Sequence, residues 1–341
     1  MPVSDKNFNN IKIHTQYSIC EGAIKIDDLA EYCKLNKIKS IGLADSYNLC
    51  GALEFSEKLS KVGTQPLIGT QINLRAHNII GKITLYATSE QGFKNLTKLS
   101  SLSYLKKNET EDPSCDLNDL LLNNKDLILL TGNYYNFFGK LLYANKVKDF
   151  EKIIKSLKDH FNNDRLYFEI QRHGEDEEKN FENYLLKYSK TFKIPLIATQ
   201  EVFYLNEDMY EAHDALTCIG EKKFIDDKSR FKYSNQHFLK KDENLTKLYS
   251  DIPEALENNY NFHLRFNFKP KKSKPILPSI ANEQSNSPEE ELMKQARDGL
   301  ANRINNFILK KNLGKTNEQI KVDYQDRLTH EINIINSMDY A

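Results

Sequence analysis

Near the start of the chain, His14 and Glu21 are the residues best suited to chemistry, in the stretch NIKIHTQYSICEG. The alternating run from Ile11 to His14 predicts a short strand with His14 at its C-terminal end, and Glu21 follows after a polar loop. An imidazole and a carboxylate can bind a metal ion or move a proton. Two such donors do not hold a metal, so either further ligands come from later in the chain or a former site has lost them.

Polar side chains also stand within this first apolar run, and at the start or the end of later runs that have the length of strands. These positions, with two aromatic residues among them, are Lys12, Asp45, Ser46, Tyr47, Gln71, Lys82, Asn133, Glu201 and Phe203. In a barrel of alternating strands and helices, ligands gather at the C-terminal ends of the strands and in the loops that follow. We therefore expect these residues to share one site with His14 and Glu21.

The elements that would position this site alternate along roughly the first 220 residues. Apolar runs such as SIGLA, PLIGTQINL, KITLYA, DLILLTG, LYFEIQ and IPLIAT are separated by amphipathic stretches of helical length. Helices are predicted over about 147–160 and 177–190 and from about Glu207 onwards. Regular alternation indicates parallel strands with crossover helices. About six or seven such units favour an α/β fold of the distorted (β/α)7 barrel type over an open sheet.

The composition changes in the stretch FNFKPKKSKPILPSIANEQSNS, which combines prolines, a lysine cluster and an Asn/Ser run. We predict a domain over residues 1–265, a linker over 266–287 and a second region over 288–341. Ser287 and Pro288 make a good helix start, and a second helix is predicted from about Tyr324. The apolar face of that helix needs a cover, so we expect the chain to be the truncated start of a longer protein.

Charge and cysteine content exclude several classes of protein. Lys plus Arg and Asp plus Glu both number 48, so no overall basic field attracts nucleic acid or a membrane surface. The five cysteines contain no CxxC pair, which argues against a disulfide framework and a zinc ribbon. No signal-peptide core and no membrane-length apolar window is present. A cytoplasmic protein with no membrane partner is expected.

Several blocks, in this order, resemble the N-terminal polymerase-and-histidinol-phosphatase (PHP) domain of the bacterial replicative DNA polymerase III alpha subunit. They are IHTQYSICEGAIKIDDL, GLADSYNLCGALEF, PLIGTQINL, EQGFKNLTKLSS, LILLTG, FEIQRHG, PLIATQEVFYLNEDMYEAHDAL and LYSDIPEALENN. The final stretch, YQDRLTHEINIINSMDYA, is similar to the start of the family's polymerase palm. The resemblance therefore implies a PHP barrel over 1–265 and the start of the palm region over 288–341. Packing or hydrogen-bonding roles are expected for His173 and His213 in these blocks.

The resemblance also implies a metal pattern, since metal-competent members of the family carry histidine and acidic ligands at the strand ends. In chain order this pattern falls on Lys12, His14, Glu21, Ser46, Gln71, Lys82, Asn133, Glu201 and Phe203. The side chains that can still donate to a metal are His14, Glu21 and Glu201. The ligand positions that are lost are Lys12, Ser46, Gln71, Lys82, Asn133 and Phe203.

Lysine at a ligand position is especially unfavourable for a metal. An ammonium has no lone pair to offer, and its positive charge opposes a nearby cation. We therefore predict that the barrel binds no catalytic metal and hydrolyses no phosphoester. Lys12 and Lys82 are expected to pair with Glu21 or Glu201, which would keep the cleft neutral and folded.

For function, the resemblance implies that the full-length parent is a DNA-directed DNA polymerase using two Mg²⁺ ions held by palm aspartates. We assign no polymerase catalytic residue here, because the tail has no closely spaced acidic cluster. The implied partners are primer–template DNA, the proofreading exonuclease subunit, the sliding clamp and the clamp loader. The barrel would then be a structural and docking module. The alternative is a metal-dependent PHP phosphoesterase or 3′–5′ exonuclease in the barrel itself.

Overall fold

The computed structural model describes residues 7–106, 112–162, 164–276, 287–311 and 314–341. The chain divides into two compact units, Met1–Lys272 and Ser273–Ala341. None of the helices in the described ranges combines the length and the hydropathy that a membrane span needs.

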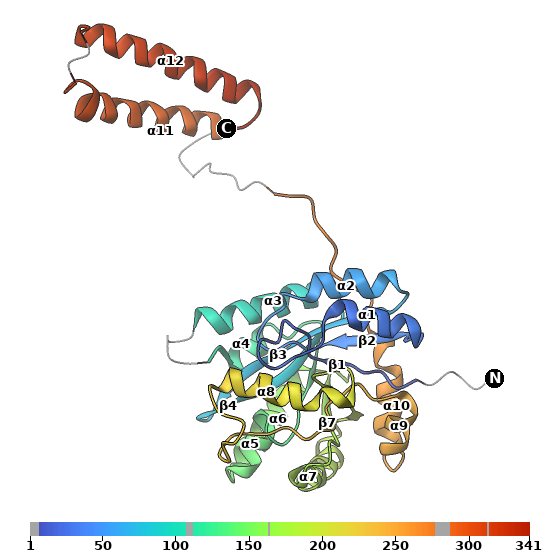
Figure 1. Ribbon diagram of the computed structural model, residues 1–341. Coiled ribbons are helices and arrows are strands. Elements are labelled where there is room, and N and C mark those ends of the chain that lie inside the picture. The colour runs from blue at the N-terminus through green and yellow to red at the C-terminus, as the bar shows by residue number, and fades with distance from the viewer. Residues whose placement is uncertain (1–6, 107–111, 163, 277–286, 312–313) are drawn as a thin grey trace. The chain divides into compact units, whose positions relative to one another are not determined.

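The first unit is built on a curled mixed sheet with helices around it (Figure 1). Its strands are β1 (Lys12–Ile13), β2 (Ser40–Leu43), β3 (Gln65–Ala76), β4 (Ile79–Ala87), β5 (Ser114–Asp116), β6 (Leu127–Leu130), β7 (Leu166–Ile170), β8 (Leu196–Ala198) and β9 (Glu201–Val202). The strand order is β8-β7-β6-β4-β3-β2-β1-β9, and β5 pairs with β3. Only Thr199 and Gln200 separate the two edge strands β8 and β9 along the chain, so the sheet curls almost into a barrel. The predicted distorted α/β barrel is confirmed.

One strand departs from the predicted parallel arrangement. β4 runs antiparallel to both of its neighbours, β3 and β6, whereas the other neighbouring strands pair in parallel. His77 and Asn78 connect β3 to β4 with φ angles of 49° and 58°. Two successive left-handed residues make the tight turn that joins antiparallel strands. The prediction of parallel strands throughout was wrong here, because no crossover helix fits between residues 76 and 79.

Helices cover the sheet, with α1 to α3 along one side and α5 to α7 along the other (Figure 1). The helices of the first unit are α1 (Ile26–Leu35), α2 (Ala52–Lys61), α3 (Glu90–Leu105), α4 (Leu117–Leu122), α5 (Phe137–Tyr143), α6 (Val147–His160), α7 (Asp176–Phe192), α8 (Tyr210–Glu221), α9 (Asp242–Leu248) and α10 (Pro253–Phe262). The helices predicted over 147–160 and 177–190 are confirmed as α6 and α7. The helix expected near Glu207 begins as a 3₁₀ turn, Glu207–Met209, and continues as α8.

An apolar layer contributed by most of the strands fills part of the barrel interior, and the end of α10 closes it. Its buried residues are Ile11, Ala44, Leu67, Tyr86, Ile128, Leu130, Tyr167, Ile197, Phe262 and Phe266. Tyr167 and Glu169 on β7 are two residues apart, so both point to the same face of the strand. The polar site described below therefore begins where this apolar layer ends.

A pair of buried asparagines ties the start of the chain to α10 and β8. The Asn9 backbone N–H donates to Asn259 Oδ1 at 2.7 Å, and Asn9 Nδ2 donates to the Asn259 carbonyl at 2.7 Å. Asn259 Nδ2 donates to the carbonyls of Asn9 and Ala198, each at 2.9 Å. These bonds hold the segment before β1 against β8, where the barrel would otherwise remain open.

The first unit extends further along the chain than residue 265. Phe266 is buried against the ring of Tyr86, and the Phe268 ring lies 5.5 Å from that of Phe93. Ser56 Oγ donates to the Pro270 carbonyl at 2.9 Å. Because these contacts fix residues that the sequence assigns to a linker, the compact unit ends at Lys272. Residues 277–286 of the expected linker lie outside the described residues.

The second unit consists of α11 (Pro288–Arg303), a π-helical turn (Ile304–Ile308) and α12 (Asn317–Ser337). The start of α11 is as predicted, with the Ser287 side chain accepting from the Glu290 N–H. α12 begins before the predicted Tyr324, because Thr316 and Gln319 form a capping box that starts the helix within a polar segment.

Candidate functional site

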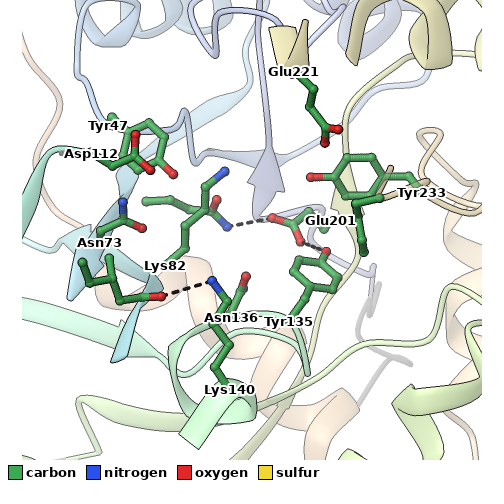
Figure 2. Close-up of a pocket in the computed structure, with 13 residues that line it drawn as sticks. Tyr47, Asn73, Lys82, Asp112, Tyr135, Asn136, Lys140, Glu201, Glu221 and Tyr233 are labelled. Atoms are coloured by element: carbon green, nitrogen blue, oxygen red, sulfur yellow. Dashed lines mark hydrogen bonds between the residues drawn. The ribbon is translucent and has the colours of Figure 1, made fainter. Parts of the chain in front are cut away.

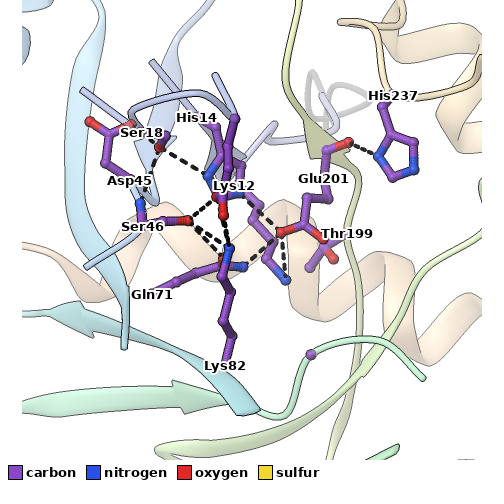
Figure 3. Close-up of polar contacts among 12 residues, drawn as sticks. Lys12, His14, Ser18, Asp45, Ser46, Gln71, Lys82, Thr199, Glu201 and His237 are labelled. Atoms are coloured by element: carbon purple, nitrogen blue, oxygen red, sulfur yellow. Dashed lines mark hydrogen bonds and ion pairs between the residues drawn. The ribbon is translucent and has the colours of Figure 1, made fainter. Parts of the chain in front are cut away.

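A buried lysine lies at the centre of the predicted site (Figure 3). Lys12 on β1 pairs in register with Glu201 on β9, while Glu169 comes from β7. The Lys12 Nζ lies 3.1 Å from Glu169 Oε1 and 3.6 Å from Glu201 Oε1. The Lys12 and Glu169 side chains are 0% exposed and that of Glu201 is 2% exposed, so the three charges meet away from solvent.

Besides Lys12, Glu201 contacts three further side chains of the site. Its Oε1 atom lies 3.0 Å from His14 Nε2 and accepts from Gln71 Nε2 at 2.7 Å. Its Oε2 atom accepts from the Tyr135 hydroxyl at 2.7 Å. Burial alone would raise the pKa of Glu201, but the Lys12 charge and the hydrogen bonds from His14 and Tyr135 hold this pKa well below its ordinary value.

A second ion pair lies beside the first. The Lys82 Nζ on β4 lies 2.6 Å and 2.7 Å from the two carboxylate oxygens of Glu21 and 3.0 Å from Ser46 Oγ. Ser46 Oγ in turn donates to Glu21. Burial raises the pKa of Glu21, but the charges of Lys82 and His14 together with the hydrogen bonds from Lys82 and Ser46 outweigh it, and the net shift is downward. Burial lowers the pKa of Lys82, while Glu21 and Tyr47 raise it above its ordinary value.

The predicted pairing of Lys12 and Lys82 with Glu201 and Glu21 is thus confirmed, but the closest partner of Lys12 was missed. Glu169 Oε1 also accepts from Gln171 Nε2 and Thr199 Oγ1, each at 2.6 Å, and Glu169 Oε2 accepts from the Gly132 N–H at 2.8 Å. The one signal available in the sequence was Glu169 itself, a carboxylate within the otherwise uncharged strand LYFEI.

Asp45 organises the loop that carries His14. It accepts from the Thr15 N–H at 2.6 Å, from Thr15 Oγ1 at 2.7 Å and from Ser18 Oγ at 2.7 Å. Ser18 Oγ also lies 3.2 Å from His14 Nδ1. Burial raises the pKa of Asp45, and these hydrogen bonds oppose the shift. Asp45 therefore orients the His14 ring through Ser18.

Two further predicted positions lie at the border of the network. Phe203 stacks on the His14 ring with 4.5 Å between the ring centroids. Asn133 Nδ2 donates to Glu178 Oε1 at 3.1 Å, and the same oxygen lies 2.8 Å from His173 Nδ1. His173 Nε2 accepts from the backbone N–H of Glu201 at 3.2 Å. Asn133 therefore belongs to a neighbouring network that supports β9 and does not contact the Glu201 carboxylate.

His173 and His213, which lie outside the metal pattern, have the hydrogen-bonding roles expected for them. His173 bridges α7 and β9 as described above, and burial lowers its pKa well below the ordinary value. His213 on α8 donates from Nε2 to the Glu21 carbonyl at 2.8 Å, and burial lowers its pKa to about 4.

A cavity of about 490 Å³ opens onto the network (Figure 2). Tyr47, Gln71, Lys82, Tyr135 and Glu201 are among the residues that line it. The size falls in the range of small-molecule sites. However, the Lys82 ammonium and both carboxylate oxygens of Glu201 already have hydrogen-bonding partners within the protein.

The residues present do not fit the metal cluster that the strand-end pattern would imply. Within the described residues, no group of three or more His, Cys, Asp and Glu side chains is arranged to hold a metal ion. The carboxylates of Glu201 and Glu21 already contact the ammonium groups of Lys12 and Lys82, and those cations lie where the charge of a metal would be placed. The absence of a bound metal remains a prediction for experiment.

Comparison with known proteins adds the following similarities. Residues 10–173 match the PHP domain family. The chain is 32% identical to a DNA polymerase III subunit alpha of Caulobacter vibrioides, with 98% of this chain and 29% of that protein aligned. The corresponding protein of Rickettsia conorii is 33% identical, with 98% and 28% aligned. The chain therefore spans less than a third of the length of these relatives.

Among solved structures, a putative metal-dependent phosphoesterase from Bifidobacterium adolescentis aligns with a TM-score of 0.39 and 12% identity. The alignment covers 57% of this chain and 86% of that one. An amidohydrolase from Chromobacterium violaceum aligns with a TM-score of 0.40 and 10% identity, covering 61% and 96%.

Proposed function

Because the chain carries a PHP domain and is related over nearly all of its length to bacterial DNA polymerase III alpha subunits, we propose that it is the N-terminal part of such a cytoplasmic replicative polymerase. In the full-length parent, the reaction is template-directed transfer of a deoxynucleotide to a primer 3′ end. Mg²⁺ ions held by acidic residues stabilise the charge that develops on the transferred phosphoryl group. Those acidic residues lie outside this chain, so the chain alone does not extend a primer.

Within the parent, the barrel has a structural role and does not hydrolyse phosphoesters. The observation that carries this proposal is the pair of ammonium groups among the strand-end carboxylates, Lys12 beside Glu169 and Glu201, and Lys82 on Glu21. Hydrolysis at such a site needs carboxylate or imidazole lone pairs directed at a metal or at a water molecule. Here the carboxylates are neutralised internally, which supports a stable scaffold.

The second candidate function is a metal-dependent phosphoesterase or 3′–5′ exonuclease in the barrel. The cavity of about 490 Å³ beside Lys82 and Glu201 favours it, because a substrate would have room there. It requires a metal to displace the lysines from Glu21 and Glu201, which the short Lys82 contacts oppose.

One experiment separates the two functions. The purified chain is dialysed, its Zn²⁺ and Mn²⁺ content is measured, and release of nucleotides from a labelled DNA 3′ end is followed with and without added metal. The scaffold role predicts less than 0.1 metal ion per chain and no metal-dependent release. Metal-dependent release that disappears in His14→Ala would establish the hydrolytic role instead, and stoichiometric metal without release would contradict only the expected absence of a metal.

Docking of the proofreading exonuclease subunit is the partner role proposed for the barrel, alongside contacts of the full-length chain with primer–template DNA, sliding clamp and clamp loader. It is supported by an exposed apolar surface, here called the α8 surface, comprising Ile19, Ile219, Phe224 and Ile225. These side chains are 59–85% exposed. Gly220 on α8 lies directly against Cys20, so Ile19 and Ile219 flank a close contact. Exposed apolar side chains that gather in this way are typical of protein-binding sites.

The docking role is tested by measuring the affinity of the chain for a proofreading exonuclease subunit. Phe224→Asp should weaken binding at least tenfold, whereas Leu264→Asp, at a side chain that is also highly exposed at 71%, should leave it unchanged. Equal affinities for both variants would show that the exonuclease subunit docks elsewhere.

A further inference from the structure

The pair of helices α11 and α12 carries a groove that has no part in the functions proposed above. The two helices lie side by side (Figure 1). The groove has a volume of about 980 Å³ and is lined by residues between Gly299 and Lys311 and by Tyr324 on α12. All of these residues belong to the second unit, Ser273–Ala341, so the groove is a property of that unit alone.

Positive charge is concentrated in this groove. Arg303, Lys310 and Lys311 line it, and the described residues that line it include no Asp or Glu. These three cations have no carboxylate partner within the described parts of the chain, whereas Lys315 and Arg327 of the same unit each form an ion pair. Because the whole chain has equal numbers of acidic and basic residues, only a local grouping of this kind can attract an anion.

Two aromatic side chains are accessible in the same groove. Phe307 is 66% exposed and Tyr324 is 39% exposed. Phe307 belongs to the π-helical turn, in which the Leu309 N–H donates to the Ile304 carbonyl at 3.0 Å. Ile304 is buried, so the turn packs through this residue and leaves the Phe307 ring at the surface. π-helical turns are frequent at functional sites.

Unpaired cations and accessible aromatic faces together fit single-stranded nucleic acid. The phosphates of such a strand bind lysine and arginine, and its unstacked bases stack on aromatic side chains. A duplex also offers phosphates, but its bases are already stacked on one another and leave the aromatic rings without a partner. An acidic peptide would satisfy the cations, but its carboxylates offer no flat surface to the rings. The combination therefore favours a single strand.

We propose that the groove of the second unit binds single-stranded nucleic acid without sequence preference. Arg303, Lys310 and Lys311 contact phosphates, and Phe307 and Tyr324 stack on bases. This contact lies within the 341-residue chain, whereas the proposed function places DNA contact in the full-length parent. A chain that does not bind would therefore refute the role of the groove and leave the relation to DNA polymerase III alpha subunits unchanged.

The test measures binding of the full chain by fluorescence anisotropy. The probes are a labelled oligothymidylate of about twelve nucleotides and an abasic strand of the same length and charge. Contact with three phosphates predicts a slope of about −2 for log K against log salt concentration, so the affinity should fall roughly twentyfold between about 50 mM and 200 mM salt. The abasic strand should bind at least about fivefold more weakly, because it has no bases to stack.

Two substitutions separate the two kinds of contact. Lys310→Gln should bring the salt slope about 0.7 closer to zero, because one phosphate contact is lost. Phe307→Ala should weaken binding of oligothymidylate at least about fivefold and leave binding of the abasic strand unchanged. Lys321→Gln, at an exposed lysine of α12 that does not line the groove, and Phe224→Ala, at an exposed aromatic residue of the first unit, are the matched controls and should bind as wild type does.

Three results would overturn the proposal. The first is no binding of oligothymidylate by wild type at about 50 mM salt, and the second is equal affinity of the groove variants and the control variants. The third is loss of binding to the abasic strand in Phe307→Ala, because the ring would then support the fold of the unit and not a base. A labelled oligoglutamate peptide of the same net charge tests the other class of partner. Tighter binding of this peptide than of oligothymidylate would assign the groove to an acidic protein segment instead.

Discussion

Replacing Glu169 by Gln should destabilise the first unit by about 3 kcal/mol. The change keeps the shape of the side chain and removes its charge, so Lys12 is left with Glu201 at 3.6 Å as its counter-ion. Breaking a buried ion pair on one side costs about 3–5 kcal/mol, and the remaining carboxylate reduces that cost. In addition, the amide has one acceptor oxygen, whereas the carboxylate has two. Either the Gly132 N–H, which bonds to Oε2, or the Gln171 and Thr199 side chains, which bond to Oε1, therefore lose their acceptor.

The assay is urea and thermal unfolding of the full chain followed by circular dichroism at 222 nm. At about 2–4 °C per kcal/mol, a loss of about 3 kcal/mol lowers Tm by about 6–12 °C. Glu90→Gln is the matched control, because Glu90 forms an exposed pair with Lys94 at 2.9 Å and such pairs contribute less than about 1 kcal/mol. If the two variants lose the same stability, or if Glu169→Gln loses less than about 1 kcal/mol, the Lys12 site does not have the energetic role derived for it.

Three other outcomes are expected. Because the pKa of folded Glu201 lies below its ordinary value of about 4.3, its contribution to stability is present above that pH and is lost as the pH falls toward the folded pKa. Glu201→Gln should therefore flatten the pH dependence of the unfolding free energy below about pH 5, measured by urea titration at several pH values. Asn259→Ala should cost about 2–3 kcal/mol because it leaves buried groups of Asn9 and Ala198 unpaired, whereas the exposed Asn261→Ala should cost little. Adding a chelator to wild type should leave its Tm unchanged, and a drop of several degrees would mean that a bound metal stabilises the barrel.

The sequence predicted the parts of this protein that follow from local periodicity. The helices over 147–160 and 177–190 were readable because their apolar residues recur at helical spacing, which packing against a sheet requires. The gathering of Lys12, Glu21, Lys82 and Glu201 was predictable from their places at strand ends, since the ends of neighbouring strands meet whatever the details of packing.

Residues inside a strand gave no comparable signal. In LYFEI both faces of β7 are buried, one against helices and one toward the barrel interior, so alternation does not show which face is polar. Glu169 is recognisable as a residue of the site only in the structure, where the curled sheet places it in contact with Lys12. The direction of β4 depended on the two-residue turn at His77 and Asn78, which lacks the glycine of the Asn-Gly and Asp-Gly pairs that mark such turns in a sequence.

The pairing of β1 with β9 has a consequence for how the protein is made. β1 meets its neighbour β2 early, but Lys12 pairs with Glu201 and Asn9 bonds to Asn259, so the other edge of the first strand finds its partners only after most of the first unit has left the ribosome. At about 5–20 residues per second, the segment around Lys12 waits roughly 10–40 seconds for β9. During that time a lysine destined for a dry interior stays hydrated, which helps keep the nascent chain from aggregating, and it loses its water only when the last strand arrives. Long-range closure of this kind places the barrel among slowly folding topologies.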